Sequence, residues 1–410
     1  MVGGSAGRPR RPYVPILVAA LGYFVDIYDL ILFSIVRVPS LTSLGLSGEA
    51  LLESGVLLLN MQMAGMLVGG IAWGVMGDRK GRLSVLFGSI LLYSLANIAN
   101  AFVHDVNMYA ALRFIAGVGL AGELGAGITL VAEILPKDIR GYGTTLVASV
   151  GVMGAVVAAL VADAFDWRVA YIVGGVMGLA LLVLRIGVFE SGLFEEVKQR
   201  SAVSRGNFFA LFAKPARTRR YLSVVLVGLP IWYVIGILIT LSPELGAAVG
   251  VHPKPSAARA VLFAYLGLTV GDLASGLLSQ WLRSRKKALG TFLSLTTTFI
   301  LIYFAPFEKP LELFYTLCFA LGVSIGYWAV FVTVASEQFG TNLRATSTTT
   351  APNFVRGALV PVTLLFQALR EPLGLSMAGL TVGLLTVAVA LVALWGLEET
   401  FGRDLDFVEE

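Results

Sequence analysis

Apolar runs of about 20 residues alternate with short polar segments along the chain. A helix needs roughly 20 mainly apolar residues to cross the hydrocarbon core of a bilayer. The pattern therefore predicts twelve membrane-spanning helices, at 13–36, 52–76, 83–102, 107–132, 141–165, 168–188, 221–247, 257–282, 287–306, 311–336, 345–369 and 374–396. The longest polar stretch follows the sixth span.

The two sets of six spans resemble each other. "AEILPKDIRG" ends the fourth span and "SEQFGTNLRA" ends the tenth, and in both a Glu precedes an Arg by seven positions. Such parallel repeats are typical of large transporters. We expect an all-α membrane protein made of an N-terminal six-helix bundle (1–188), a cytoplasmic linker (189–220), a C-terminal six-helix bundle (221–396) and a cytoplasmic tail (397–410), with a cavity between the bundles.

Composition and charge agree with this interpretation. The chain is 57% hydrophobic and only 14% charged, against about 25% charged in soluble domains. Most Lys and Arg residues fall in the segments that a cytoplasmic N-terminus would place inside, and only a few, Arg37 among them, in the predicted outer loops. This bias predicts an integral protein of the cytoplasmic membrane with both termini inside. The net charge of +4 does not indicate nucleic-acid binding, because the basic residues lie in loops between the apolar spans.

Carboxylates inside the spans are the first candidates for chemistry. Asp26 and Asp29 interrupt the apolar run "GYFVDIYDLILFSI", and Glu123 lies in the fourth span. Charged groups at this depth are costly and mark functional sites. Asp26 and Asp29 share one helical face, and the predicted boundaries put Asp29 level with Arg113 and Asp26 level with Glu123. We expect Asp26, Asp29 and Glu123 to couple transport to protons; the alternative is an ion pair that only fixes helix packing.

In-span cations and aromatic residues are the candidates for substrate binding. Arg113 and Arg356 can each bind a carboxylate, although Arg356 could equally pair with Asp272 of the eighth span. Aromatic residues of the first, seventh and tenth spans could stack on a substrate, or simply pack against lipid. They are Tyr28, Trp232, Tyr233, Tyr327 and Trp328.

The turn "GVMGDRKGR" between spans two and three resembles the cytoplasmic loop signature of the major facilitator superfamily, which implies the fold of that name. The resemblance covers essentially the whole chain. It implies a cytoplasmic gate of charge pairs that stabilise the outward-facing state. The residues that we assign to this gate are Gly77, Asp78, Arg79, Gly81, Arg82, Glu133, Arg140, Glu337 and Arg344.

Further stretches narrow the resemblance. "GYFVDIYDL", "RFIAGVGLAGELGAG", "AEILPKDIRG" and "ESGLFEE" resemble motifs of the metabolite:proton symporters, although Gly192 replaces a Pro of that pattern. The fourth and fifth spans are also similar to those of sialate transporters. These families carry carboxylates and zwitterions, and the resemblance places the first, fourth, seventh and tenth helices around the central cavity.

The expected function is proton-coupled symport of a small organic acid or zwitterion by alternating access. An efflux antiporter of the same fold is the first alternative; the fifth span, "SVGVMGAVVAAL", lacks the Pro-Gly motif expected of one. A sensor that carries nothing is the second. The motifs indicate no enzyme, no metal site and no cofactor, with the proton as coupling ion. We expect a monomer whose partners are a carboxylate-bearing small molecule, protons and the bilayer, and not nucleic acid.

Overall fold

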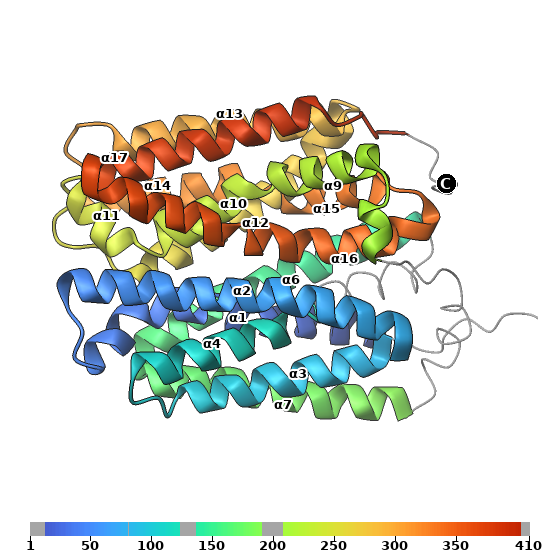
Figure 1. The fold of residues 1–410 in the computed structure, drawn as a ribbon, viewed down its shortest axis with the longest axis horizontal. Helices are drawn as coiled ribbons and strands as arrows, with labels where there is room; N and C mark the ends of the chain where they lie inside the picture. Colours follow the sequence, from blue (N-terminus) through green and yellow to red (C-terminus); the bar gives the residue numbers. More distant parts are fainter. Residues whose placement is uncertain (1–12, 81, 124–136, 191–207, 403–410) are drawn as a thin grey trace, which may run out of the picture.

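Two groups of helices lie side by side in the computed structural model, and the helices run mostly along the long axis of the molecule (Figure 1). The structure describes residues 13–80, 82–123, 137–190 and 208–402. We call the end at which α7 stops and η1 begins the linker end, and the other end the opposite end. The description of α4 stops with the turn at 121–123, so the rest of the predicted fourth span lies outside the described residues.

The first group packs six helices, five of which are continuous over 19 to 33 residues. Because every backbone donor and acceptor must be satisfied inside a bilayer, each apolar run forms a helix. Asp105 caps the start of α4, where its side chain accepts a hydrogen bond from the backbone N–H of Met108 over 2.9 Å. The helices are α1 (Tyr13–Ser43), α2 (Gly48–Lys80), α3 (Arg82–Asn100), α4 (Val106–Leu120), α6 (Lys137–Ala164) and α7 (Trp167–Glu190).

In the second group three spans are broken. Pro230 lacks a backbone N–H, and the seventh span divides there into α9, α10 and the π-helical η2. The tenth span breaks between α14 and α15, and the eleventh between α16 and α17. The elements are η1 (Phe208–Phe212), α9 (Pro215–Val227), α10 (Leu229–Tyr233), η2 (Val234–Ile239), α11 (Ser242–Ala248), α12 (Ala257–Trp281), α13 (Arg285–Phe304), α14 (Leu311–Ile325), α15 (Trp328–Glu337), α16 (Thr341–Gly357) and α17 (Leu359–Trp395).

The twelve predicted spans all have a helical counterpart. Eight stretches are long and apolar enough to cross a membrane, and Val85–Asn100, Val106–Leu120 and Val150–Ala164 are shorter apolar helices. The longest stretch, Thr346–Trp395, contains two spans, because Gly374 has a positive φ of 75° and turns the chain back inside α17.

The placement of Arg37 in an outer loop is wrong. Helix α1 continues to Ser43, so Arg37 is helical, and its side chain is fully buried. The helix can continue past this charge because Glu244 of α11 accepts a hydrogen bond from Arg37 over 2.6 Å. Seven further residues of α1 follow the predicted end of the first span at 36.

Glycines allow the same close helix contact in both groups. A Cβ on Gly65 or Gly117 would overlap backbone of the other helix of the α2–α4 pair. In the second group Gly267 and Gly322 meet the same restriction between α12 and α14. Small residues let helices approach closely in membranes. The contact recurs because spans two and four correspond to spans eight and ten, as expected of an internal repeat.

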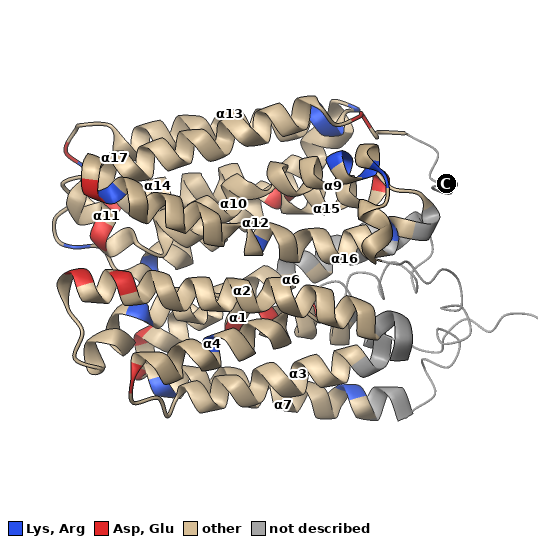
Figure 2. Ribbon diagram, viewed as in Figure 1, with Lys and Arg blue, Asp and Glu red and all other residues tan. Residues whose placement is uncertain are grey.

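Charged residues gather at the two ends of the molecule, and long stretches of the ribbon between them carry none (Figure 2). This distribution fits a protein whose middle lies in hydrocarbon. The few charged side chains in the middle therefore define where a functional site can be.

Candidate functional site

Arg356 of α16 is a buried cation where the two groups of helices meet. Its side chain is 2% exposed. The guanidinium carbon lies 5.5 Å from the ring centroid of Trp232 and 5.5 Å from that of Trp328. Its Nη1 donates to Oδ1 of Asn353 over a long 3.4 Å. In the part of the chain that the structure describes, no carboxylate forms an ion pair with it.

The broken helices put the two indoles beside Arg356. Trp232 lies in the short α10, directly after the break at Gly228, and Trp328 is the first residue of α15. A Cβ on Gly228 would lie 2.7 Å from Val355, so the glycine lets α9 and α10 approach α16. Helix interruptions of this kind are frequent at functional sites.

The carboxylate of Asp272 bonds the start of α15, at the break in the tenth span, and does not pair with Arg356. Its Oδ1 accepts a hydrogen bond from the backbone N–H of Ala329 over 3.1 Å, in the first turn of α15. A carboxylate is favourable there because the first amides of a helix lack intrahelical acceptors. The ion pair between Arg356 and Asp272, one of the two alternatives for Arg356, is absent among the described residues.

The first group of helices also contributes to the surroundings of Arg356. The guanidinium interacts electrostatically with Tyr23 and Asp26 of α1 and with Tyr265 of α12. Asn353, one turn before Arg356, donates to the backbone carbonyl of Ala121 over 3.0 Å. The site is therefore built from both groups, and aromatic side chains surround its single cation.

Arg113 has a different environment. Its Nη2 donates to Oε1 of Gln62, and its Nη1 lies 3.5 Å from the Tyr171 hydroxyl. The guanidinium carbon is 5.1 Å from the ring centroid of Phe33. These partners belong to α1, α2 and α7, so Arg113 is fully buried inside the first group. No ion pair joins it to Asp29 among the described residues, although its charge acts on that carboxylate.

The three candidate carboxylates are all buried. Asp26 is 3% exposed, Asp29 0% and Glu123 2%. Glu123 forms an ion pair with Arg185 of α7, which the sequence analysis left without a role. Asp29 faces α7, where a Cβ on Gly174 would overlap its Oδ1. The oxygens of Asp26 and Asp29 accept no hydrogen bond from the described residues.

The five candidate aromatic residues divide into two sets. Trp232 and Trp328 flank Arg356. The other three use their hydroxyls to bond the backbone of a neighbouring helix, so each is held in helix packing. Tyr28 donates to Ala170, Tyr233 to Gly379 and Tyr327 to Val227, over 2.9, 2.6 and 3.0 Å.

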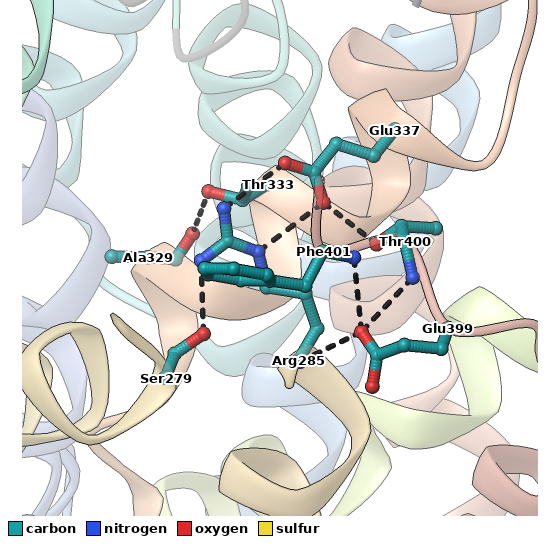
Figure 3. A network of polar contacts seen from close by, with 8 residues as sticks. All are labelled: Ser279, Arg285, Ala329, Thr333, Glu337, Glu399, Thr400 and Phe401. Carbon is teal, nitrogen blue, oxygen red and sulfur yellow. Dashed lines mark hydrogen bonds and ion pairs between the residues drawn. The ribbon is translucent and has the colours of Figure 1, made fainter. Parts of the chain in front are cut away.

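Part of the candidate gate at the linker end is visible. Glu337 pairs with Arg285 over 3.1 Å and accepts a hydrogen bond from Thr400 over 2.6 Å (Figure 3). Arg344 lies in the first turn of α16 and is partly buried. The side chains of the other gate residues lie outside the described part of the chain: Gly77, Asp78, Arg79, Gly81, Arg82, Glu133 and Arg140.

Glu399 in the tail after α17 completes this network. It accepts hydrogen bonds from the backbone N–H groups of Arg285 and Phe401, over 2.9 and 3.0 Å, and from the Ser284 hydroxyl. Burial alone would raise the pKa of Glu399, but the bonds from Ser284 and from these backbone donors outweigh it and lower that pKa. The tail is thereby fixed to the start of α13.

Ion pairs join the two groups at the opposite end. Arg37 of α1 bonds Glu244 of α11 over 2.6 Å, and nearby the hydroxyl of Thr240 donates to Ser34 over 2.9 Å. Arg370 of α17 reaches Glu49 of α2 over 2.5 Å. These contacts close the interface at this end. The sequence analysis missed them, because it assigned charges near predicted span ends to solvated loops.

No three His, Cys, Asp or Glu side chains gather as metal ligands would within the described ranges. The described residues place a buried cation between two indoles, near a row of buried carboxylates, where the two groups of helices meet.

Comparisons with known proteins identify the class of protein as a membrane transporter. The family model of the Major Facilitator Superfamily matches residues 19–360. The niacin transporter of Acinetobacter baylyi is 25% identical, with 97% of this chain and 96% of that protein covered. The 3-(3-hydroxy-phenyl)propionate transporter of Escherichia coli is 32% identical over 53% of this chain and 54% of that protein. The sialic acid transporter of Escherichia coli is 26% identical over 48% of each.

A solved structure shows the same fold. The D-xylose-proton symporter superposes with a TM-score of 0.70 at 18% identity, over 96% of this chain and 99% of that one. The chain therefore belongs to the Major Facilitator Superfamily. It is an integral membrane transporter and not an enzyme, and its predicted resemblance to metabolite and sialate transporters is confirmed.

Proposed function

We propose that the protein is a proton-coupled symporter that brings a small carboxylate-bearing molecule across the cytoplasmic membrane by alternating access. The observation that carries the proposal is Arg356, a guanidinium buried between two indoles without a carboxylate partner among the described residues. A buried charge is costly unless it is paired. A bound carboxylate would supply the missing charge, and an Arg can bind it through two parallel hydrogen bonds.

The surroundings of Arg356 favour an acid with a flat or apolar body. Trp232 and Trp328 flank the guanidinium, and Tyr23 and Tyr265 adjoin it. Aromatic walls exclude water and suit a ring that stacks against them. The relatives named for niacin and 3-(3-hydroxy-phenyl)propionate support this choice, because each of those molecules joins a carboxylate to an aromatic ring.

Asp26 is the residue that we assign to proton coupling at the substrate site. It is buried, it lies near the middle of α1, and its charge interacts with that of Arg356. When Asp26 is ionised it partly neutralises Arg356; when it is protonated, Arg356 is freer to attract a substrate anion. Proton and anion would then bind together, which is the condition for symport.

At the opposite end the buried Arg37–Glu244 pair joins the two groups of helices, and the more exposed Arg370–Glu49 pair adds little, as expected of an inward-facing or occluded carrier. We assign this end to the outside of the cell and the linker end to the cytoplasm, because basic residues predominate in the segments at the linker end. The carrier acts as a monomer without a cofactor, with one pathway between its own two halves.

The test begins with purified protein and three probes: niacin, 3-(3-hydroxy-phenyl)propionate and D-xylose. We expect the two acids, and not the sugar, to raise the melting temperature. In proteoliposomes the stabilising acid should show counterflow, and an inward proton gradient should drive its accumulation. The Asp26→Asn variant should keep counterflow and lose accumulation. Accumulation by this variant as in wild type would rule out Asp26 as the coupling residue.

A further inference from the structure

Several buried polar side chains inside the first group of helices take no part in the proposed substrate site. They lie on the facing sides of α1, α3 and α7, away from Trp232 and Trp328. Asp29, Tyr93, Ser94 and Asn97 are each fully buried. Among the described residues, the Tyr93 and Ser94 hydroxyls, the Asn97 amide and both Asp29 oxygens make no hydrogen bond. Buried polar groups are nearly always satisfied, so such a concentration needs an explanation.

Contacts with α7 show that these groups adjoin one another. A Cβ on Gly174 would overlap Oδ1 of Asp29, and a Cβ on Gly178, one turn further, would overlap Oγ of Ser94. Asn97 lies beside Asp29, and its amide makes no hydrogen bond among the described residues. The two glycines thus leave room for polar groups of α1 and α3 between three closely packed helices.

The row continues toward the linker end. Tyr93 lies beside Ser94 against Gly178, within electrostatic range of Asp26, Asp29, Glu123 and Arg185. Beyond it, Glu123 and Arg185 form their ion pair against Gly22 of α1, whose absent Cβ would lie 2.9 Å from Oε1 of Glu123. Oε2 of Glu123 and Nη1 of Arg185 make no hydrogen bond among the described residues.

We propose that protons cross the N-terminal half through its own interior, along this row of polar groups, and meet the substrate site only at Asp26. Asp29 takes up a proton from the outer side and transfers it to the carboxylate of Asp26. Asp26 then passes it to Glu123, which releases it on the cytoplasmic side. Glu123 leaves its ion pair with Arg185 while it holds the proton and restores the pair on release. The inference rests on the proposed symport function.

Other charged groups bear on this row from neighbouring helices. Arg113 of α4 acts on Asp29, and Arg356 of α16 acts on Asp26. The tyrosines Tyr23, Tyr28 and Tyr171 also adjoin the two aspartates. Asp26 is the carboxylate of the row, among the described residues, that also interacts with the cation of the substrate site. This position explains how a proton path separate from the substrate can still be coupled to it.

The test removes groups of the row that we have not assigned to the substrate site. Ser94→Ala and Asn97→Leu delete polar atoms, and Gly174→Ala places a methyl group against Asp29. Their matched controls lie in the C-terminal half. Ser324→Ala changes an equally buried serine whose hydroxyl bonds only its own helix, and Gly276→Ala adds a Cβ with nothing within 4 Å.

Each variant is reconstituted with whichever of niacin and 3-(3-hydroxy-phenyl)propionate stabilises the wild type. We expect counterflow to stay within about twofold of wild type while pH-driven accumulation falls by about tenfold, and the controls to keep both. Undiminished pH-driven accumulation by Asn97→Leu and Ser94→Ala would overturn the inference. So would parallel loss of counterflow, or accumulation driven by a sodium gradient alone. Absence of counterflow by the wild type would instead overturn the proposed function.

Discussion

Arg113 and Arg356 are both buried arginines in the middle of the protein, and neither forms an ion pair among the described residues, but their hydrogen-bond partners differ. Arg113 bonds Gln62 of α2 and approaches Tyr171 of α7. Arg356 makes one long bond to Asn353 and lies between two indoles, beside helices that are interrupted. Among the described residues, Arg356 therefore has no hydrogen-bond partner from another helix, whereas Gln62 and Tyr171 of two other helices hold Arg113.

The largest effect is expected for Arg356→Lys. Lysine keeps the charge but lacks the planar fork that binds a carboxylate through two hydrogen bonds, and it interacts less well with two indoles. Affinity for the stabilising acid should fall by about a hundredfold, equivalent to roughly 3 kcal/mol, while the protein still folds. Equilibrium binding to the detergent-purified variant measures this. Unchanged affinity would show that Arg356 does not bind the carboxylate of the substrate, so that it would no longer differ from Arg113 in this respect.

The second effect concerns the opposite end, where the halves touch. Glu244→Gln leaves the fully buried Arg37 without its counter-charge, which should favour separation of the halves by about 1–3 kcal/mol. A reporter cysteine at the buried Ser242 should then react with a maleimide about tenfold faster.

Arg370→Gln is the matched control for Glu244→Gln. The partners of Arg370, Glu49 and Glu53, are 72% and 58% exposed, and such surface pairs contribute little. Equal labelling rates in Glu244→Gln and in wild type would show that the buried pair does not hold this end closed.

A third, smaller effect is expected for Arg113→Lys. The substitution loses the bonds to Gln62 and Tyr171, so it should lower the free energy of unfolding by about 1–3 kcal/mol. Substrate affinity should stay within about twofold of wild type, because the partners of Arg113 are the protein's own. Melting temperature and binding, measured on one preparation, separate the two outcomes. A large loss of affinity without loss of stability would make Arg113 the binding residue and reverse our assignment.

The smallest effect belongs to the tail of the C-terminal half. Because the folded state lowers the pKa of Glu399, its contacts stabilise the fold above the ordinary value of 4.5. That contribution is lost as the pH falls through the lowered folded value. The melting temperatures of wild type and Glu399→Gln should therefore differ at pH 7 and converge as the pH falls below 4.5. Parallel curves over this range would mean that Glu399 makes no such contribution.

The sequence predicted all twelve spans, because helix formation in a bilayer needs only an apolar run of sufficient length. It did not predict the breaks beside Trp232 and Trp328, although Pro230 and Gly326 mark them. It also placed Arg37 in a loop, because the sequence around Arg37 gives no indication of its partner Glu244, which lies more than 200 residues away. A span that is apolar all round gives no sign of which face points inward. The sequence therefore could not show that Tyr28, Tyr233 and Tyr327 are buried in helix packing.

The side chain of Asn353 links Arg356 to the contact between the two halves. Its amide nitrogen holds the Ala121 carbonyl of one half, while its amide oxygen accepts from Arg356 of the other. If the halves move apart here, the amide loses its anchor and can turn, and the support of Arg356 changes with it. A ligand can shift a conformational equilibrium only by its difference in affinity for the two states. This one side chain supplies such a difference, so the strength of substrate binding would itself report which way the carrier faces.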